Sequence, residues 1–340
     1  MIPKPRSFGA GYEMLSLESM HEMWSLSSRR SRLAFACVAS FLLALAATAS
    51  SRGGGSGIVG RPLKTCEAIL DDLDEEYDER RENRHKRRRG WRGVKVMFDL
   101  YEPEATCFRE ERFGASDSGE RFDAYGDGPK FVCGVDLIAA KAKDGNADGC
   151  LVYSVGSNND VQFEKAVHTH MGCEIHTFDP TLNKPFIGGM YSTFHPWGLG
   201  TDGGNEGRAA NGRKDNWIRK SFETVINDLG HVNRTIDILK IDCEGCEYAA
   251  MPPLFDLISS GNARVNQIQI EMHARGTSPR SAKMIYDFFL AADRAKFRII
   301  HKERNNWGCN GHRCVEYVFV SESFLRYVNG NVVCPEIGDI

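Results

Sequence analysis

From about residue 131 to residue 321 the chain alternates between segments typical of buried strands and segments typical of helices. Helices are predicted at residues 160–170, 216–230 and 279–292, and from the end of residues 236–242 to about Ser260. The strand-like segments are predicted at residues 150–156, 173–180, 190–200, 236–242, 265–273, 296–302 and 314–321. This alternation predicts an α/β fold with a mostly parallel sheet and helices on both faces.

The last two predicted strands differ from the others in their connection. They are joined by ERNNWGCNGHR, residues 303–313, which is too short for a crossover helix. Parallel neighbours need such a crossover, whereas antiparallel neighbours do not. We therefore expect the sheet to end in a C-terminal antiparallel hairpin.

The length, composition and net charge of the chain limit the classes of protein to which it can belong. With 340 residues, 41% hydrophobic and 26% charged, it has the composition of a globular protein with one large domain plus appendages, or two small domains. The net charge of -3 gives no global basic field, so a nucleic-acid partner is not expected.

An apolar segment near the N-terminus is typical of membrane targeting. Residues 33–49, LAFACVASFLLALAATA, contain no charge and follow Arg29, Arg30 and Arg32. As a single-pass signal anchor the segment would leave the catalytic domain in the lumen of the ER or Golgi, and the long polar leader favours this. As a cleaved signal, with its small-x-small ATA end, it would give a secreted protein, and its Ala-rich composition favours that. A transit peptide is a third option, disfavoured by the acidic residues of the leader.

Four regions follow from these patterns: a polar leader at 1–32, the anchor or signal segment at 33–50, a linker and charged stalk at 51–93, and the folded domain at 94–340. The stalk opens with SRGGGSG, a flexible linker composition. Its charged part, DDLDEEYDERRENRHKRRRG, is acidic and then basic. A solvated helix with paired charges explains it better than a patch for phosphate or anionic lipid.

The chain has eleven cysteines, one of them, Cys37, in the apolar segment. The even remainder suits disulfides in an oxidising compartment, although the sequence does not assign the pairs, and buried free thiols are the alternative. A local disulfide between Cys309 and Cys314 is geometrically reasonable, whereas zinc there would lack a fourth ligand. The pair Cys243 and Cys246 fits either thiol chemistry or a place beside an acidic active-site turn.

Ligands of parallel α/β sheets bind at the carboxyl ends of the strands, so the residues that follow each strand are the candidates for a site. Gly156 directly follows the first strand, which allows a ligand to approach the backbone closely. Asp179 follows the second strand, where it could accept both hydroxyls of a ribose or form an Asx turn before Pro180. The G-x-G-x-x-G fingerprint of dinucleotide binding is absent from the sequence.

Carboxylates and an imidazole follow two later strands. Asp242 and Glu244 come after residues 236–242, while Glu271 and His273 end residues 265–273. Such a cluster could bind a divalent cation or act as general base toward a hydroxyl. Glu247 has a simpler explanation, because acidic residues are favoured in the first turn of a helix.

Lys240 is expected to have a structural role. It lies among apolar strand residues and is predicted to pair with a nearby acid.

The order of these motifs resembles the FkbM-related branch of class I S-adenosylmethionine-dependent methyltransferases, in its membrane-anchored methyltransferase-like subgroup. The resemblance covers about residues 105 to 325. It rests on the blocks GDGPKFVC, VYSVGSNNDVQFE, FDP, FHPWGLG, LKIDCEGCEY and IQIEMH, in that order. The resemblance implies a Rossmann-like fold with a seven-stranded sheet.

The resemblance also implies roles for individual residues. Gly156 and its turn, with Asn158, would hold the methionine part of S-adenosylmethionine, Asp179 would bind the ribose hydroxyls, and Leu199 would contact the adenine. The residues facing the acceptor would be Asp242, Glu244, Glu271 and His273. The first motif departs from the general acidic-x-Gly-x-Gly-x-Gly pattern, because Ser154 replaces the acid.

The function expected from this resemblance is methyl transfer to the oxygen of a hydroxyl acceptor, which could be a small molecule, a glycan or a lipid. A base such as His273 or Asp242 would take the proton, with or without a divalent metal. The alternatives are a membrane-tethered binding protein that keeps the fold with weak or no activity, and a Rossmann oxidoreductase. Asn233-Arg234-Thr235 is a sequon for N-glycosylation in the lumen.

Overall fold

The structure is a computed structural model, and its described residues all belong to one compact unit, Lys64–Ile340. They comprise residues 98–114, 129–143, 149–203, 217–274, 278–305 and 313–331, and the isolated residues 75, 78, 79, 207, 208, 214, 215 and 309. The predicted leader, the apolar segment and almost all of the charged stalk lie outside the described residues. Among the helices that are described, none combines the length and apolar character needed to span a bilayer.

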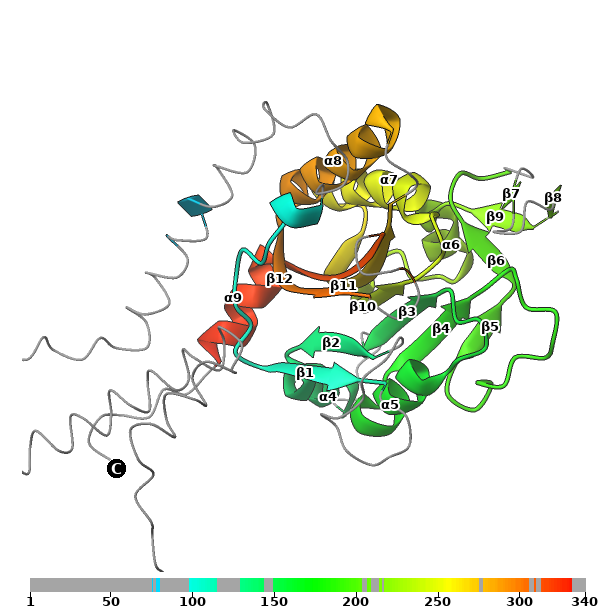
Figure 1. The fold of residues 1–340 in the computed structure, drawn as a ribbon. Coiled ribbons are helices and arrows are strands. Elements are labelled where there is room, and N and C mark those ends of the chain that lie inside the picture. Colours follow the sequence, from blue (N-terminus) through cyan, green and yellow to red (C-terminus); the bar gives the residue numbers. More distant parts are fainter. Residues whose placement is uncertain are drawn as a thin grey trace, which may run out of the picture. The chain divides into compact units, whose positions relative to one another are not determined.

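A seven-stranded sheet forms the centre of the unit, in the order β12-β13-β11-β10-β3-β4-β5 (Figure 1). All neighbouring strands are parallel except β13, which runs antiparallel to both β11 and β12. The α/β class, the mostly parallel seven-stranded sheet and the C-terminal antiparallel hairpin are therefore confirmed. The strands are β3 (Leu151–Val155), β4 (Glu174–Phe178), β5 (Thr193–His195), β10 (Thr235–Ile241), β11 (Arg264–His273), β12 (Phe297–Arg304) and β13 (Cys314–Ser321).

Helices cover both faces of this sheet (Figure 1). On one face, α6 (Phe222–Asp228), α7 (Glu247–Ser259) and α8 (Pro279–Arg294) contribute to a large buried cluster that includes Phe255 and Phe288. On the other face, α4 (Val135–Lys143), α5 (Gln162–Met171) and α9 (Glu322–Gly330) contribute to a second buried cluster. Successive residues of β3 divide between the two clusters, since side chains alternate along a strand.

Two predictions near the middle of the chain were wrong in detail. Residues 190–200 form two short strands rather than one, β5 and β6 (Trp197–Leu199), and Pro196 separates them. Proline has no N–H to donate to a strand ladder, which accounts for the break. The predicted helix at 216–230 is also shorter, because β9 (Ile218–Lys220) pairs with β6 before α6 begins.

Other elements carried no clear pattern in the sequence. The strands β1 (Glu110–Phe113) and β2 (Lys130–Cys133) form an antiparallel pair, which brings Lys130 toward the main sheet. A second small pair joins β7 (Gly207–Arg208) to β8 (Lys214–Asp215). Strands this short leave little periodicity to read.

All eight cysteines of the described residues form disulfides, which fits the expectation of paired cysteines. The pairs are Cys107–Cys133, Cys150–Cys173, Cys243–Cys246 and Cys309–Cys314. The local pair Cys309–Cys314 is the one proposed from its spacing. Cys150–Cys173 links the starts of β3 and β4, which are neighbours in the sheet.

Candidate functional site

The direction of the chain through the sheet locates the place where a ligand would bind. From β3 the chain proceeds to β4 and β5 on one side, and it later returns to β10 on the other side of β3. The strand order therefore reverses between β3 and β10. In open α/β sheets, ligands bind in the crevice at the carboxyl ends of the strands beside such a reversal.

The turn after β3 is built from residues in unusual backbone conformations. Gly156 has φ +76°, and a Cβ there would lie 1.7 Å from the carbonyl oxygen of Asp242. Asn158 and Asn159 follow with φ 46° and 65°, in the left-handed region that Asn tolerates better than most residues. Only glycine fits at position 156, because the turn after β3 packs directly against the end of β10.

Asp179 lies directly beneath this turn and is buried. Its Oδ2 accepts hydrogen bonds from the backbone N–H groups of Ser157 and Asn158, at 3.0 and 2.7 Å. Its Oδ1 accepts from the N–H and hydroxyl of Thr181, at 2.9 and 2.6 Å. Asp179 thus holds the turn in place, and a ribose hydroxyl would have to share oxygens that already accept these bonds. The ribose contact stays a prediction.

Leu199 ends β6 and is buried with the larger core cluster. Its neighbour Trp197 carries the Lys220 ammonium 3.3 Å from its ring centroid. The contact of Leu199 with adenine also stays a prediction.

Lys240 does not pair with an acid as predicted. Its Nζ donates to the carbonyl oxygen of Gly156 at 3.0 Å and thus ties β10 to the turn after β3. The structural role was correct and the partner was wrong, because a backbone carbonyl of the left-handed turn supplies the acceptor.

The four predicted catalytic residues meet at the carboxyl ends of β10 and β11. His273 Nε2 lies 3.5 Å from Glu244 Oε2 and 3.7 Å from Glu271 Oε2. Asp242 offers a carboxylate oxygen within 4.8 Å of ligand atoms of both Glu244 and His273. Asp242 is half-buried, Glu244 is exposed, and Glu271 and His273 are buried. The cluster therefore has an open side at Asp242 and Glu244 and a closed side at Glu271 and His273.

The charges in this cluster shift two pKa values in the same direction. Burial, followed by the negative charges of Asp242 and Glu316, raises the pKa of Glu271 to about 8. Burial alone would lower the pKa of His273, but its hydrogen bond to Glu247 and the charges of nearby carboxylates raise it to about 9. His273 is therefore an imidazolium at neutral pH, which makes it a poor proton acceptor and a good partner for negative charge.

Several residues of the site were not recognised as such from the sequence. Glu247, explained from the sequence as a helix N-terminal charge, does begin α7, but it is also fully buried and accepts hydrogen bonds from the N–H groups of Gly245 and His273. Asn305 donates to Glu271 Oε1 at 2.9 Å. Asn305 directly follows β12, beyond the strand predicted at residues 296–302, whereas Glu247 lies in the first turn of a helix.

Two further residues were not predicted, one beside the acidic cluster and one beside β3. Lys130 is buried and pairs with Glu316, and although burial lowers its pKa, the charges of Glu316, Asp242 and Glu271 raise it above its ordinary value. Lys130 belongs to the block GDGPKFVC, which was the available signal. Glu164 is fully buried under β3 and accepts a hydrogen bond from Ser154, the residue that replaces the acid of the first motif.

The disulfide between Cys243 and Cys246 closes the turn that carries Glu244. Within it, Glu244 has φ 56° and Gly245 has φ 111°. The bonded pair thus fixes a strained turn beside His273, and the interpretation of these cysteines as neighbours of the acidic residues fits the geometry.

The carboxylates of the cluster could hold a hard divalent cation. Oxygen atoms of Asp242, Glu271 and Glu316 lie within 4.8 Å of one another. The ammonium of Lys130, paired with Glu316, supplies positive charge to the same place, so the cluster does not require a metal ion for charge balance.

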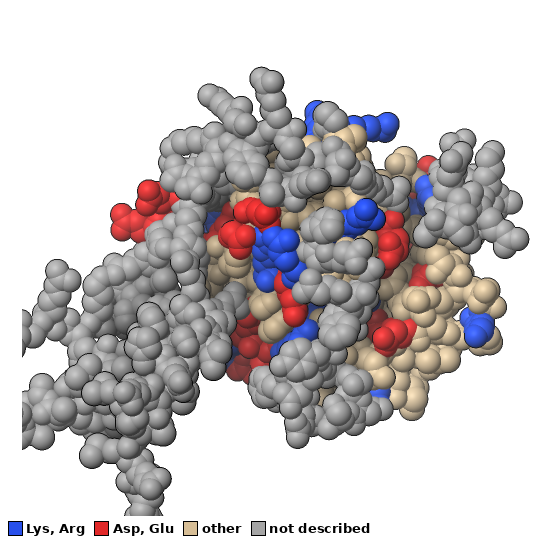
Figure 2. Space-filling view, in the orientation of Figure 1, with Lys and Arg blue, Asp and Glu red and all other residues tan. Residues whose placement is uncertain are grey.

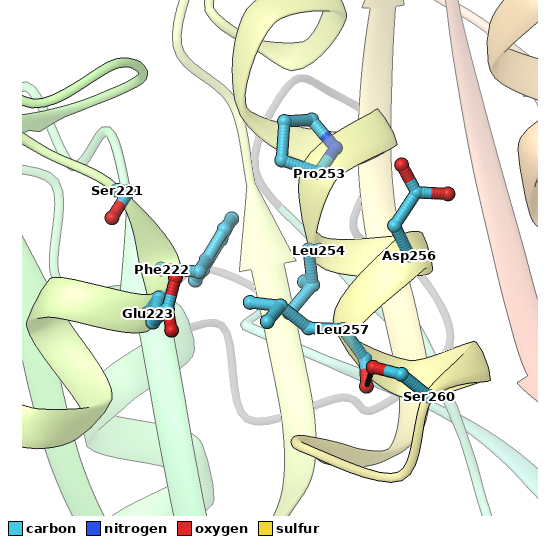
Figure 3. A pocket seen from close by; sticks show the side chains of 8 residues that line it. All are labelled: Ser221, Phe222, Glu223, Pro253, Leu254, Asp256, Leu257 and Ser260. Carbon is cyan, nitrogen blue, oxygen red and sulfur yellow. Dashed lines mark hydrogen bonds between the residues drawn. The ribbon is translucent and has the colours of Figure 1, made fainter.

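A cavity of about 430 Å³ lies elsewhere, between α6 and the second half of α7 (Figure 3). None of the eight predicted site residues lines it. Its lining residues are Ser221, Phe222, Glu223, Pro253, Leu254, Asp256, Leu257 and Ser260.

The described surface shows no separation of charge on the face seen in Figure 2, where acidic and basic side chains are interspersed. The part of this face over β4 and β5 is mostly uncharged.

Comparison with known proteins gives distant relatives. The human protein named "Probable methyltransferase-like protein 24" is 24% identical over 166 residues, covering 46% of this chain and 43% of the relative. The rat protein of the same name is 24% identical over 160 residues, covering 45% and 42%. The match thus spans less than half the length of each relative.

Solved structures show a weak likeness. The antibiotic-resistance methyltransferase Kmr has 15% identity and a TM-score of 0.30, covering 58% of this chain and 97% of its own. A Burkholderia thailandensis 1,6-didemethyltoxoflavin-N1-methyltransferase has 10% identity and a TM-score of 0.29, covering 55% and 78%. At these TM-scores the superpositions add nothing to the topology described above.

A family model gives the decisive match. The model described as "Methyltransferase domain" matches residues 70–321, which include the whole seven-stranded sheet and well over half of the chain. The chain therefore belongs to this family of methyltransferase domains.

Proposed function

We propose that this protein transfers a methyl group from S-adenosylmethionine to the oxygen of a hydroxyl acceptor. The observation that carries the proposal is the meeting of two features at one reversal of strand order. The glycine turn after β3 lies against the end of β10, and the Asp242–His273 cluster begins at that same end. The ordered motifs that resemble the FkbM-related branch support the same cofactor.

The residues of the turn after β3 are suited to one end of the cofactor. Ser157, Asn158 and Gly156 present a turn whose conformation is fixed from below by Asp179 and Lys240. These residues would hold the methionine end of S-adenosylmethionine. When bound, the cofactor supplies an electrophilic methyl group on a positively charged sulfur.

The acidic cluster would then prepare the acceptor. The acceptor hydroxyl would lie against Asp242, on the open side of the cluster, and its proton would pass to the carboxylate of Asp242. The pKa of Glu271 is raised to about 8, so Glu271 is mostly protonated at neutral pH and leaves Asp242 as the proton acceptor. As the acceptor oxygen bonds to the methyl carbon, the bond from that carbon to sulfur breaks and its electron pair stays on S-adenosylhomocysteine.

His273 would act as a charged partner rather than as the base. Its imidazolium faces Glu244 and Glu271, so it can stabilise negative charge that develops on the acceptor oxygen. This assignment modifies the expectation that either His273 or Asp242 takes the proton, since the raised pKa of His273 leaves it protonated at pH 7.

The experiment uses S-adenosylmethionine with an isotopically labelled methyl group and the purified full chain. Extracts and panels of small molecules, glycans and lipids serve as acceptors, and labelled products are found by mass spectrometry. D242N is expected to bind the cofactor within about threefold of wild type and to lose about 10² to 10⁴ in rate, whereas E271Q, which resembles the protonated carboxyl, should lose less. E223Q, which changes an exposed acid in the first turn of α6, is the control and should keep full activity.

A second candidate function is a binding protein that keeps the fold without turnover. The specific observation in its favour is the altered first motif, in which Ser154 with Glu164 replaces the usual acid. Saturable cofactor binding with no labelled product from any acceptor panel would favour this candidate over the enzyme.

We also propose that the domain resides in the secretory pathway, behind the apolar segment at 33–49. Four disulfides among the described residues support an oxidising compartment. Asn233 of the sequon is exposed and can receive a glycan. Glycosidase treatment of the protein from secretory membranes should increase its gel mobility, and unchanged mobility together with protease accessibility in intact vesicles would contradict a luminal domain.

A further inference from the structure

A second group of potential ligands lies at the other end of the sheet from the acidic cluster. It consists of Glu174 and His176 on β4 and His231 in the connection between α6 and β10. Glu174 Oε1 lies 2.8 Å from His176 Nε2 and 3.5 Å from His231 Nε2. One ligand atom from each of the three residues falls within 4.8 Å of the others.

The fold explains why these side chains converge. Glu174 and His176 are two residues apart on β4 and so point to the same face of the sheet. His176 is in register with Tyr153 on β3, and the Tyr153 ring contacts both histidine rings. Both imidazoles are buried, whereas 45% of the Glu174 side chain is exposed. The site is therefore enclosed on the protein side and open to solvent at the carboxylate.

The ring nitrogens that face away from Glu174 are already occupied. His231 Nδ1 is 2.8 Å from the hydroxyl of Tyr153, and His176 Nδ1 is 2.8 Å from Nε2 of His195. Metal-binding histidines commonly engage their second nitrogen in this way, which fixes the ring and directs the first nitrogen toward the ion. Here both Nε2 atoms are directed toward the same carboxylate oxygen.

We propose that Glu174, His176 and His231 form a binding site for a zinc-class divalent ion, with a solvent molecule as the fourth ligand. Two imidazoles and one carboxylate are a ligand set that zinc accepts, with ligand atoms roughly 3.3 Å apart in a tetrahedral site. The observed separations of 2.8 and 3.5 Å bracket that spacing.

Arg234 defines how the carboxylate would bind. Its Nη1 lies 2.6 Å from Glu174 Oε2, so that oxygen is held outside the site and Oε1 alone faces the imidazoles. Glu174 would therefore bind through one oxygen, and Arg234 would orient it.

This site is independent of the proposed methyl transfer. Glu174 begins β4 and Asp179 follows its end, so the two sites are separated by the length of that strand, about 16 Å. Loss of the metal site should leave cofactor binding intact, and loss of cofactor binding should leave the metal site intact.

The test is titration of the tag-free, metal-depleted full chain with Zn²⁺ and, for its visible spectrum, Co²⁺. The expected result is one ion per chain, an intense tetrahedral Co²⁺ spectrum, and X-ray absorption that shows two imidazole ligands. H231Q and E174Q should each lose more than about 100-fold in affinity for Zn²⁺, because each removes a ligand atom rather than an outer partner. Y153F should keep the stoichiometry and weaken binding less, because it removes only the partner of His231 Nδ1.

The matched control is H170Q, which changes an exposed histidine on α5, and it should bind Zn²⁺ as wild type does. Folding of each variant is checked by circular dichroism. Results on the wild-type protein are enough to overturn the proposal: either no ion binds, or the X-ray absorption spectrum shows no imidazole ligands. Equal affinity in wild type, H231Q and E174Q would overturn it as well.

Discussion

Glu247 and His273 are joined by two contacts to one carboxylate oxygen, although 26 residues separate them in sequence. The backbone N–H of His273 donates to Glu247 Oε1 at 3.0 Å, and the imidazole Nδ1 lies 3.3 Å from the same atom. A helix N-terminus thereby fixes both the end of β11 and the ring that follows the strand. The direction of His273 Nε2 toward Glu244 and Glu271 is a consequence of this arrangement.

The first prediction concerns this contact. E247Q should lower the pKa of His273, because the anionic partner is replaced by a neutral amide. We expect the free energy of unfolding to fall by about 1 to 3 kcal/mol, since a buried charged hydrogen bond is weakened. Methyl transfer should fall about 10- to 100-fold. The His273 pKa is measured by NMR titration of its ring protons.

The control for E247Q is E223Q, which removes an exposed acid from the first turn of α6. It should change stability by less than about 1 kcal/mol, as expected for the helix dipole alone. An unchanged His273 pKa in E247Q would show that Glu247 does not raise the pKa of this imidazole.

The second prediction is that the protein loses stability as the pH rises from about 4.5 to about 9. The pKa of Glu271 is raised from 4.5 to about 8, so its contribution is full below pH 4.5 and is lost as the pH rises through about 8. The pKa of His273 is raised from 6.5 to about 9, so its contribution is full below pH 6.5 and is lost as the pH rises through about 9. Both shifts act in the same direction, and since one pKa unit corresponds to about 1.4 kcal/mol, the combined loss in the free energy of unfolding is several kcal/mol.

Urea unfolding at several pH values measures this effect. E271Q removes one of the two titrating groups, so the free energy of unfolding should change about half as much with pH. Identical slopes for wild type and E271Q would contradict the assignment of the shift to Glu271.

The third prediction compares two glycines with similar backbone angles. Gly156 has φ +76° and faces the carbonyl oxygen of Asp242 at 1.7 Å, whereas Gly172 has φ +72° and nothing within 4 Å of an added Cβ. G172A should cost about 1 to 2 kcal/mol for the left-handed conformation. G156A should cost about 1 to 3 kcal/mol more, because β3 and β10 must separate. Equal losses in urea unfolding would show that the turn does not pack against Asp242.

The fourth prediction separates the roles of two disulfides. Replacing Cys150 and Cys173 by Ala should cost about 3 kcal/mol, because that bond closes a loop with a sequence separation of 23, and should leave the rate per folded molecule unchanged. Replacing Cys243 and Cys246 opens a loop with a separation of only 3 and should cost less, about 1 to 2 kcal/mol. It should nevertheless reduce methyl transfer, since Glu244 is released from its turn. A fully active Cys243/Cys246 variant would contradict this role.

The sequence predicted the sheet well because buried parallel strands are continuous apolar runs bounded by turns. Strand β3 has such a run, β10 is mostly apolar and β11 alternates apolar and polar residues, and the observed limits of all three lie within two residues of those expected. The segment 190–200 was harder, because Pro196 divides it into strands that belong to two different sheets. Pairing with β9 is a tertiary event that residue pattern alone does not record.

The site was predicted in part for a related reason. Asp242, Glu244, Glu271 and His273 were found because each stands at a strand end. Glu247, Asn305 and Lys130 come from a helix, a loop and a distant hairpin, and only the folded chain brings them to the cluster. The hydrogen bonds from the N–H groups of the preceding turn to Asp179 could not be predicted either. The sequence shows a carboxylate after a strand but not which donors the fold brings to it.

The central claim is that the turn after β3 and the cluster after β10 form one cofactor and acceptor site. Calorimetric titration of the full chain with S-adenosylmethionine, and separately with S-adenosylhomocysteine, tests it most directly. We predict saturable binding of one molecule per chain, with a rise in melting temperature, in wild type and equally in H231Q. No heat and no thermal shift with either compound, from protein shown to be folded, would contradict the claim.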